Sequence, residues 1–258
     1  MKRLLLLFSV VVYFSLYSCD KNEMKNETVK SEVENTQTSD LKKISEYHSK
    51  GLDYIYDELL KESKTRSVND KNWDSEFLKK RIYNLSIEFV RNVANVNIDD
   101  NSKTRSLTAI DNMELSSDAQ YILGDYISYL INSKNREDVE FYIQNTKENE
   151  KFKSLTEKEQ NQLIFAMYIG IDSVSYWSNP DNWEKWSCLK NGKDYNKTRS
   201  MAGPSANYWM TSEQMSDSNF LKCIKNDIFG SVASIGAGFS PWSFCYSGIV
   251  GSAGAFLL

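Results

Sequence analysis

The segment from Leu163 to Trp177 constrains the fold more than any other, because it has helical length and is apolar on nearly every side. Its only charged residue is Asp172. The preceding Thr156–Glu159 tetrapeptide has the capping-box pattern, in which a hydroxyl and a carboxylate each accept from a free amide. Asn179-Pro180 ends the pattern, since the residue before a proline disfavours helical geometry. Such a helix must be covered on all sides, so we expect it at the centre of a bundle.

Four further segments repeat apolar residues at helical spacing, namely 41–59, 75–93, 117–131 and 135–149. The chain also holds only 3 prolines and 11 glycines, which favours long helices over many-turned β architecture. In the first two segments the side chains expected to face the core are Leu41, Ile44, His48, Leu52, Ile55 and Leu59, then Phe77, Ile82, Leu85, Phe89 and Val93. We therefore predict an all-α fold, a multi-helix bundle.

The carboxy-terminal stretch 228–258 carries no charged residue and is rich in glycine, alanine and serine. Small residues at this spacing form a groove on one helix face, along which a second helix can approach closely. The two rows that recur every four positions are Gly230, Ser234 and Gly238, then Ser243, Ser247, Gly251 and Ala255. With a turn at Ser240-Pro241 between the rows, the stretch predicts a Gly/Ala/Ser-rich helical hairpin.

Three interpretations of this stretch are open from the sequence. The hairpin completes the core, or it inserts into a bilayer, although its first arm is shorter than the roughly 20 residues that a span needs. A pair of strands is the third interpretation, since short apolar runs are ambiguous by period. The stretch also resembles the Gly/Ala-rich tails of bacteriocin-like peptides and of uncharacterised Bacteroidota proteins, and that resemblance implies a membrane-active role.

The first 18 residues have the three zones of an export signal. Lys2 and Arg3 give the positive start, and an apolar run from Leu4 to Tyr17 follows. Leu16-Tyr17-Ser18-Cys19 resembles the lipobox of bacterial lipoproteins, with an aliphatic residue three positions before the cysteine and a small residue directly before it. The resemblance implies cleavage before Cys19 and acylation of its thiol and new amino terminus. Two or three acyl chains hold a protein stably on a membrane.

Asp20-Lys21-Asn22-Glu23, directly behind Cys19, resembles the surface-export signal of Bacteroidota lipoproteins. It implies the outer membrane and surface exposure, whereas the enterobacterial rule for Asp20 would imply the periplasmic face of the inner membrane. The polar residues after it are too poor in apolar side chains to fold and predict a tether of roughly 25 Å. The predicted organisation is a signal peptide (1–18), a tether (19–40), a helical domain (41–202) with a loop at 95–115 and an irregular stretch at 181–203, and a packed carboxy-terminal segment (203–258).

Besides Cys19, the chain has three cysteines, Cys188, Cys223 and Cys245. An exported chain can form disulfides, but an odd number leaves at least one thiol free. With the hairpin turn near residue 241, Cys223 and Cys245 would lie roughly 20 Å apart along the axis, beyond the roughly 6 Å between Cα atoms that a bridge needs. The candidate disulfide therefore joins Cys188 to Cys223 or to Cys245.

His48 is the only histidine of the chain and lies on the apolar stripe of the 41–59 segment. A single histidine excludes His-rich zinc sites and motifs that need two histidines, and we expect no metal site and no cofactor. One interpretation is a core histidine with one hydrogen bond. The other is a catalytic histidine that a tyrosine or an acid from elsewhere in the chain would assist.

Asp172 is the second candidate site residue, as a lone acid on an apolar helix. Apolar surroundings raise the pKa of a carboxyl group, as in catalytic acids. The competing and favoured interpretation is that Asp172 caps a neighbouring helix or pairs with a lysine. A glycosidase would need a second acid facing Asp172, for which Asp125 and Asp227 are available.

Aromatic residues crowd the end of the central helix, where Trp177, Trp183 and Trp186 lie close in sequence and Tyr208 and Trp209 follow. If exposed, such rings would stack on sugar faces, and this makes Trp183 and Trp186 candidates for glycan binding. If buried, they fill the seam between helices, which is the commoner role of large aromatic side chains.

The charge and the motif content restrict the function. The formal net charge of −4 becomes −6 once Lys2 and Arg3 leave with the signal, so no basic surface for nucleic acid is expected. The sequence shows no nucleophile motif and no phosphate-binding glycine loop. We expect a lipid-anchored, non-enzymatic domain that binds or scaffolds a partner, protein or glycan. The alternatives are a membrane-active protein that inserts its carboxy-terminal hairpin and a surface glycan-binding module.

Overall fold

The computed structural model describes residues 40–65, 74–94, 115–193, 195, 208–233 and 241–257. They belong to one unit that begins at Asp40. Within these residues the chain forms helices and no strand, which confirms the predicted all-α class. None of the described helices has both the length and the apolar character that crossing a membrane requires.

Apart from residues 40–45, the described residues contain ten helices. In chain order they are α3 (Tyr47–Thr65), α4 (Ser75–Ala94), α5 (Ser117–Asn132), α6 (Arg136–Glu148), α7 (Glu150–Lys153), α8 (Glu157–Ser178), α9 (Pro180–Lys190), α10 (Ser212–Ser216), α11 (Ser218–Ala233) and α12 (Pro241–Leu257). Residues 40–45 are helical as well, and a turn at Glu46 separates them from α3. The helices predicted at 75–93, 117–131 and 135–149 are confirmed to within two residues at each end.

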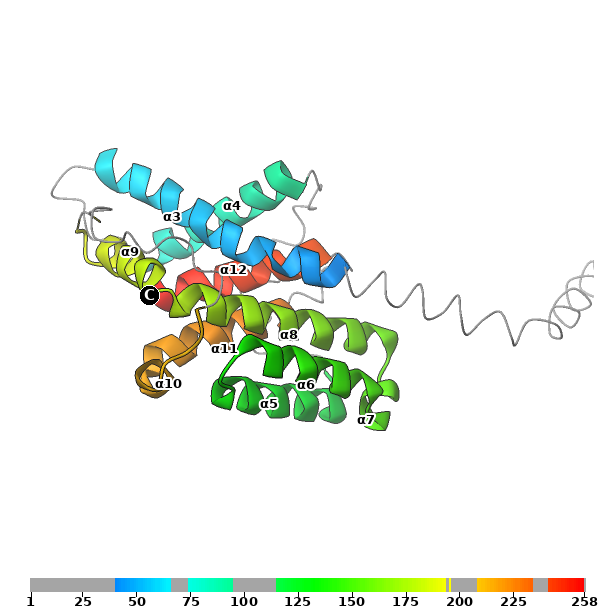
Figure 1. Cartoon of the computed structure of the whole chain (residues 1–258). Helices are drawn as coiled ribbons and strands as arrows, with labels where there is room; N and C mark the ends of the chain where they lie inside the picture. The colour runs from blue at the N-terminus through cyan, green and yellow to red at the C-terminus, as the bar shows by residue number, and fades with distance from the viewer. Residues whose placement is uncertain are drawn as a thin grey trace, which may run out of the picture. The chain divides into compact units, whose positions relative to one another are not determined.

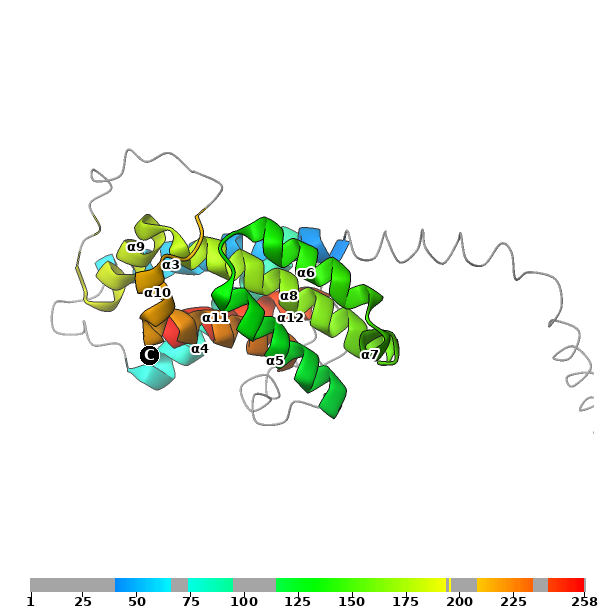
Figure 2. The same ribbon diagram turned by 60° about the horizontal axis from the view of Figure 1, so that its bottom comes forward.

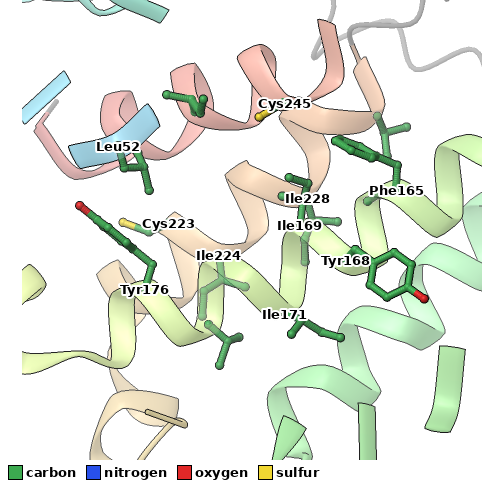
Figure 3. Packing of buried hydrophobic residues seen from close by; sticks show 14 of the residues in the cluster. Leu52, Phe165, Tyr168, Ile169, Ile171, Tyr176, Cys223, Ile224, Ile228 and Cys245 are labelled. Atoms are coloured by element: carbon green, nitrogen blue, oxygen red, sulfur yellow. The ribbon is translucent and has the colours of Figure 1, made fainter. Parts of the chain in front are cut away.

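Helix α8 occupies the centre of the bundle, as its apolar character predicts. Every side chain from Leu163 to Ile171 is buried. The helix contacts α3, α5, α6, α9, α11 and α12, which surround it in Figures 1 and 2. Figure 3 shows Ile224 and Ile228 of α11 against Ile169 of α8. Burial of this one helix therefore holds the other elements of the bundle together.

The start of α8 is fixed by the predicted capping box. The Thr156 hydroxyl accepts from the Glu159 amide at 3.3 Å, and the Glu159 carboxylate accepts from the Thr156 amide at 3.2 Å. The other oxygen of Glu159 accepts from the Ser116 amide at 2.8 Å, directly before α5. One carboxylate therefore satisfies free amides at the starts of two helices, and α8 begins at Glu157 rather than at the predicted Leu163.

The prediction of an irregular stretch at 181–203 is wrong over its first part, which forms α9. The Asn179 side chain accepts from the Asp181 amide at 2.9 Å, and Pro180 takes the first helical position, where its missing N–H has no helical partner to lose. Apolar side chains on one face then dock α9 on the core, and these are Trp183, Trp186 and Leu189.

The inward face of α4 differs from its prediction at one position. Phe77, expected to face the core, is 41% exposed. The buried stripe instead runs through Leu78, Ile82, Leu85 and Phe89, so Phe77 falls to one side of it in the first turn. The Val93 side chain lies outside the described residues.

Helices α11 and α12 form the predicted hairpin, here called the C-terminal hairpin, and run side by side in Figures 1 and 2. A Cβ atom on Gly230 would lie 2.6 Å from the carbonyl oxygen of Ser247, and one on Gly251 would lie 2.5 Å from that of Asn226. The two backbones are thus in direct contact. The inner faces of both helices are buried in the core, which confirms the buried-hairpin interpretation, and the strand interpretation is wrong.

Replacing Gly251 with alanine is expected to lower the free energy of unfolding by about 1–3 kcal/mol, because the new methyl group meets backbone that has nowhere to move. Gly124, within α5, is the matched control. A Cβ there meets no atom within 4 Å, so Gly124→Ala should stabilise the helix by up to about 1 kcal/mol. Urea denaturation followed by circular dichroism measures both changes, and equal effects at the two glycines would contradict the close approach.

Several predictions concern residues outside the described ranges. These are the signal peptide, the lipobox cysteine Cys19, the tether up to Ser39, the loop at 95–115 apart from its last residue, and the boundary between residues 202 and 203. They remain predictions. Asp40, the last residue of the predicted tether, begins the helical turn before α3.

Candidate functional site

A buried ionic cluster lies where α3, α8 and α11 meet. His48 of α3 is fully buried, with one carboxylate on either side of its ring. Its Nδ1 atom is 3.0 Å from Asp172 of α8, and its Nε2 atom is 3.4 Å from Asp227 of α11. The second contact is an ion pair without the alignment of a hydrogen bond. The sequence placed His48 and Asp172 among the candidates separately, and the structure brings them together.

Asp172 is held by three donors on a single oxygen, Oδ2. His48 Nδ1 and the Ser49 amide each lie 3.0 Å from it, and the Ser49 hydroxyl lies 2.6 Å from it. The Ser49 amide belongs to the first turn of α3, so Asp172 caps a neighbouring helix, one of the roles predicted for it. Its charged partner is a histidine and not the predicted lysine.

Asp227 connects the cluster to the C-terminal hairpin. Its Oδ2 atom accepts hydrogen bonds from the hydroxyls of Ser173 and Ser252, the latter at 2.7 Å. The Ser252 hydroxyl in turn accepts from the indole N–H of Trp177 at 2.7 Å. We call His48, Asp172 and Asp227, with Ser49, Ser173 and Ser252, the His48 centre. It takes residues from α3, α8, α11 and α12.

The two carboxylates require His48 to be charged. A neutral imidazole has one N–H and one bare nitrogen, and a bare nitrogen facing a carboxylate oxygen would repel it. Burial alone would lower the pKa of His48, but the charge of Asp227 and the hydrogen bond to Asp172 outweigh it and raise the pKa to about 10. The centre therefore contains one imidazolium between two carboxylates.

The pKa of His48 predicts how stability depends on pH. The folded value of about 10 lies above the unfolded value of 6.5, so the contribution is complete below pH 6.5 and is lost as pH rises through 10. Between these limits the free energy of unfolding should fall by about 1.4 kcal/mol per pH unit. Urea midpoints at pH 6.5, 7.5 and 8.5 measure the slope, which His48→Gln should abolish. A slope of zero in the natural chain would contradict a buried imidazolium.

The geometry of the centre does not match nucleophilic catalysis. The hydroxyls of Ser49, Ser173 and Ser252 donate to the carboxylates and not to the imidazole, whereas an activated serine bonds to its base. His48 and Asp227 also have no exposed side-chain surface for a substrate to reach. His48 lies in the core, with two carboxylate partners instead of the single hydrogen bond expected.

The pair of acidic residues that a glycosidase would need is not accessible to a sugar. Asp227 does face the same histidine as Asp172, but it is fully buried, and its Oδ2 atom accepts from two hydroxyls. Asp125 lies elsewhere, on α5, where it accepts from the Tyr142 hydroxyl at 2.6 Å. Among the described residues no group of three or more histidine, cysteine and acidic side chains is arranged to hold a metal ion.

The tryptophans after the central helix surround the end of α12. Phe256 stacks on Trp177 with ring centroids 5.0 Å apart and meets Trp183 edge-on at 4.8 Å. The Lys190 ammonium donates to the Phe256 carbonyl at 2.7 Å, a favourable place for a cation at a helix C-terminus. Trp177 and Trp186 are fully buried and Trp183 is partly buried, so the exposed rings expected for glycan stacking are not formed there.

Tyr208 and Trp209, the other two aromatic residues considered for glycan binding, are partly buried. Trp209 donates from its indole N–H to the carbonyl of Ser133 at 2.8 Å and packs on the core. Trp209 therefore attaches the segment before α10 to the turn between α5 and α6.

A second polar cluster, which sequence reasoning missed, attaches α9 to the bundle. Asp53 of α3 accepts from the Tyr176 hydroxyl at 2.9 Å and from the Lys185 ammonium at 2.5 Å. The Trp186 indole N–H donates to the same tyrosine oxygen at 2.9 Å. The signal in the sequence was Tyr176, because a tyrosine hydroxyl needs a hydrogen-bond partner once its ring is buried.

The three cysteines of the folded unit are free, so the candidate disulfide from Cys188 is not formed. Cys223 and Cys245 are buried on different arms of the hairpin, as Figure 3 shows, and burial raises the pKa of both thiols. Cys188 is partly exposed on α9. Neutral, buried thiols behave here as small apolar side chains.

Comparison with known proteins gives no relative: no family model, no curated protein and no solved structure matches this chain. The site and its surroundings must therefore be interpreted from their own chemistry.

Proposed function

We propose that this protein is a lipid-anchored component of the cell envelope that binds a protein partner and performs no covalent chemistry. The anchor is the acylated Cys19, as the resemblance of Leu16–Cys19 to a lipobox implies. The partner-binding surface is an exposed aromatic face on α5 and α6. The observation that carries the proposal is this aromatic face.

Three of the four large apolar side chains that are exposed in the described part of the chain lie on these two helices. Tyr121 is 64% exposed, Tyr129 38% and Phe141 66%. Tyr129 is held rigid by stacking on Tyr142, with ring centroids 4.3 Å apart. We call Tyr121, Tyr129 and Phe141 the α5–α6 aromatic face. Rigid, exposed aromatic rings are the side chains that contribute most at protein interfaces.

The charges around the aromatic face favour a protein partner. Lys151 pairs with Asp118 at 3.2 Å and lies over the Tyr121 ring at 4.5 Å. Arg136 pairs with Glu140 at 3.0 Å on α6. Cations and anions are interspersed and paired, so this face has no field of one sign to attract nucleic acid or an anionic membrane.

Two alternatives receive less support. A membrane-active hairpin would have to leave the core, where Ile249, Ser252 and Ala253 of α12 are fully buried. A glycan module would need open tryptophan rings, and Trp177 and Trp186 are enclosed. His48 and Asp227 likewise have no exposed side-chain surface for enzymatic chemistry, and Asp172 is only partly exposed.

Site-specific photocrosslinking in the native envelope tests the proposed surface. A photoreactive phenylalanine analogue at position 121 or 141 should give the same discrete crosslinked product, and the same residue at exposed position Lys80 of α4 should not. Phe141→Ser should also remove the product formed from position 121. Absence of a product at both positions, or an equal product at position 80, would overturn the proposal.

The anchor is tested separately. Cys19→Ser should block acylation and move the protein from the detergent phase to the aqueous phase in phase partitioning, because the mature chain then lacks its acyl chains. A protein that still fractionates with membranes after this substitution would rule out Cys19 as the anchor.

A further inference from the structure

The C-terminal hairpin is closely packed within itself. Backbone contacts at Gly230 and Gly251 bring α11 and α12 together over several turns. The Ser252 hydroxyl of α12 also donates to Asp227 of α11 at 2.7 Å. Contacts within the hairpin therefore favour its two helices moving together.

One buried charge takes part in the attachment of the hairpin to the other helices, beside apolar packing on α3, α4 and α8 and hydrogen bonds from Trp177 and Lys190. Asp227 is the only charged residue of α11 and α12 that is buried among their described residues. It meets His48 of α3 and Ser173 of α8. Gly248 of α12 lies against the same ring, since a Cβ there would be 3.5 Å from His48 Cδ2. The imidazolium is therefore enclosed between the hairpin and the helices on which it packs.

From this geometry we infer that the His48 centre is a latch: the His48–Asp227 ion pair keeps the C-terminal hairpin docked, and its loss lets α11 and α12 separate from the bundle as a unit. Cooperative opening of a supersecondary unit requires strong internal contacts and weaker external ones. The hairpin has the first in its glycine contacts. Its polar contacts with other helices are the His48–Asp227 ion pair and the hydrogen bonds from Ser173, Trp177 and Lys190. The latch is independent of the proposed partner.

Other titratable groups face the centre from each packed helix. On α8 they are Asp172 and Tyr176, on α11 Cys223 and on α12 Cys245. Burial raises the pKa of the tyrosine and of both thiols, so these three groups stay neutral well into the alkaline range. His48 is then the group whose deprotonation breaks the latch as pH rises, because the fully buried Asp227 and the partly exposed Asp172 would be left without a cation between them.

Hydrogen exchange followed by mass spectrometry on the full chain tests the latch. Asp227→Asn keeps the shape of the side chain and removes its charge. It should raise the exchange rates of amides in α11 and α12 at least tenfold and leave those of α5 and α6 unchanged. Asp57→Asn, at an exposed position of α3, is the matched control and should change neither region. The variant should also lower the titration midpoint of the single histidine, read by NMR.

Two results would overturn the latch. An equal rise in every helix would mean that the centre stabilises the whole domain without a separable unit. No rise in α11 and α12 would mean that the ion pair does not hold the hairpin. If Asp227→Asn does not fold, the natural chain at pH 7 and pH 9.5 supplies the same comparison, after correction for intrinsic exchange, with selective opening of the hairpin expected at the higher pH.

Discussion

Replacing His48 with alanine is expected to lower the free energy of unfolding by about 3–5 kcal/mol. The loss comes mainly from charge, because the fully buried Asp227 and the partly exposed Asp172 would remain with no cation between them. Removing one partner of a buried ion pair costs far more than the pair contributes as a whole. Urea denaturation at pH 6.5, where the imidazolium is fully formed, measures the loss.

The matched control for this variant removes all three charges together. His48→Leu combined with Asp172→Asn and Asp227→Asn leaves no unpaired charge in the core, and such replacements are often neutral or stabilising. The triple variant should therefore be markedly more stable than His48→Ala. A triple variant as unstable as the single one would mean that the volume of the imidazole ring, and not its charge, stabilises the fold.

The elements of this fold that local pattern encodes were predictable. Helix α8 followed from an apolar run without a polar face, and the Thr156–Glu159 capping box was recognised, although the helix begins at Glu157 and not at the predicted Leu163. The hairpin followed from small residues every four positions, since that spacing places Gly230 and Gly251 on the contacting faces. Each of these signals lies within about twenty residues of sequence, so the local spacing of residue types is enough to detect it.

The His48 centre could not be predicted from local sequence patterns of this kind. His48 and Asp172 are 124 positions apart, and Ser173 and Asp227 are 54 apart. Each residue alone was unusual, because it is a polar group on an apolar helix face. Which residue it pairs with depends on how the helices pack. Asp227 carried one further hint, because it is the last charged residue before the uncharged tail. A charged residue at the border of an apolar segment is a candidate for a buried ion pair.

Helix α9 was missed although its signals were local. Asn179 and Pro180 were interpreted as a stop for α8, yet an asparagine followed by a proline is also a good helix start. The polar residues between Trp183 and Trp186 obscured the three-residue spacing of these two tryptophans. Because Trp186 and Leu189 are buried by contact with other helices, the face of α9 becomes evident only in the folded chain.

A short repeat also marks the connections between helices. The tetrapeptide Lys-Thr-Arg-Ser stands at 64–67, 103–106 and 197–200. The first copy begins in the last turn of α3, the second falls between α4 and α5, and the third between α9 and α10. Only Lys64 and Thr65 belong to the described residues. The repeat does not follow the helical period, so a search for amphipathic stripes does not detect it.

Trp177→Ala is expected to lower the free energy of unfolding by about 3–5 kcal/mol. The indole is fully buried and stacks on Phe256, so alanine leaves a cavity at the junction of α8, α9 and α12. Its N–H also donates to Ser252, which binds Asp227 of the latch. Far-ultraviolet circular dichroism in urea measures the loss without depending on tryptophan emission.

Trp183→Ala is the matched control, since this ring meets the same Phe256 but is only partly buried. Trp183→Ala should lower the free energy of unfolding by less than half as much as Trp177→Ala, because less apolar surface returns to water. Trp177→Phe keeps an aromatic ring in part of the space and removes the donor to Ser252 together with some buried volume, so it should cost less than Trp177→Ala and more than the about 1 kcal/mol of the hydrogen bond alone. Equal losses for Trp177→Ala and Trp183→Ala would contradict a fold in which the buried indole joins the aromatic core to the His48 centre.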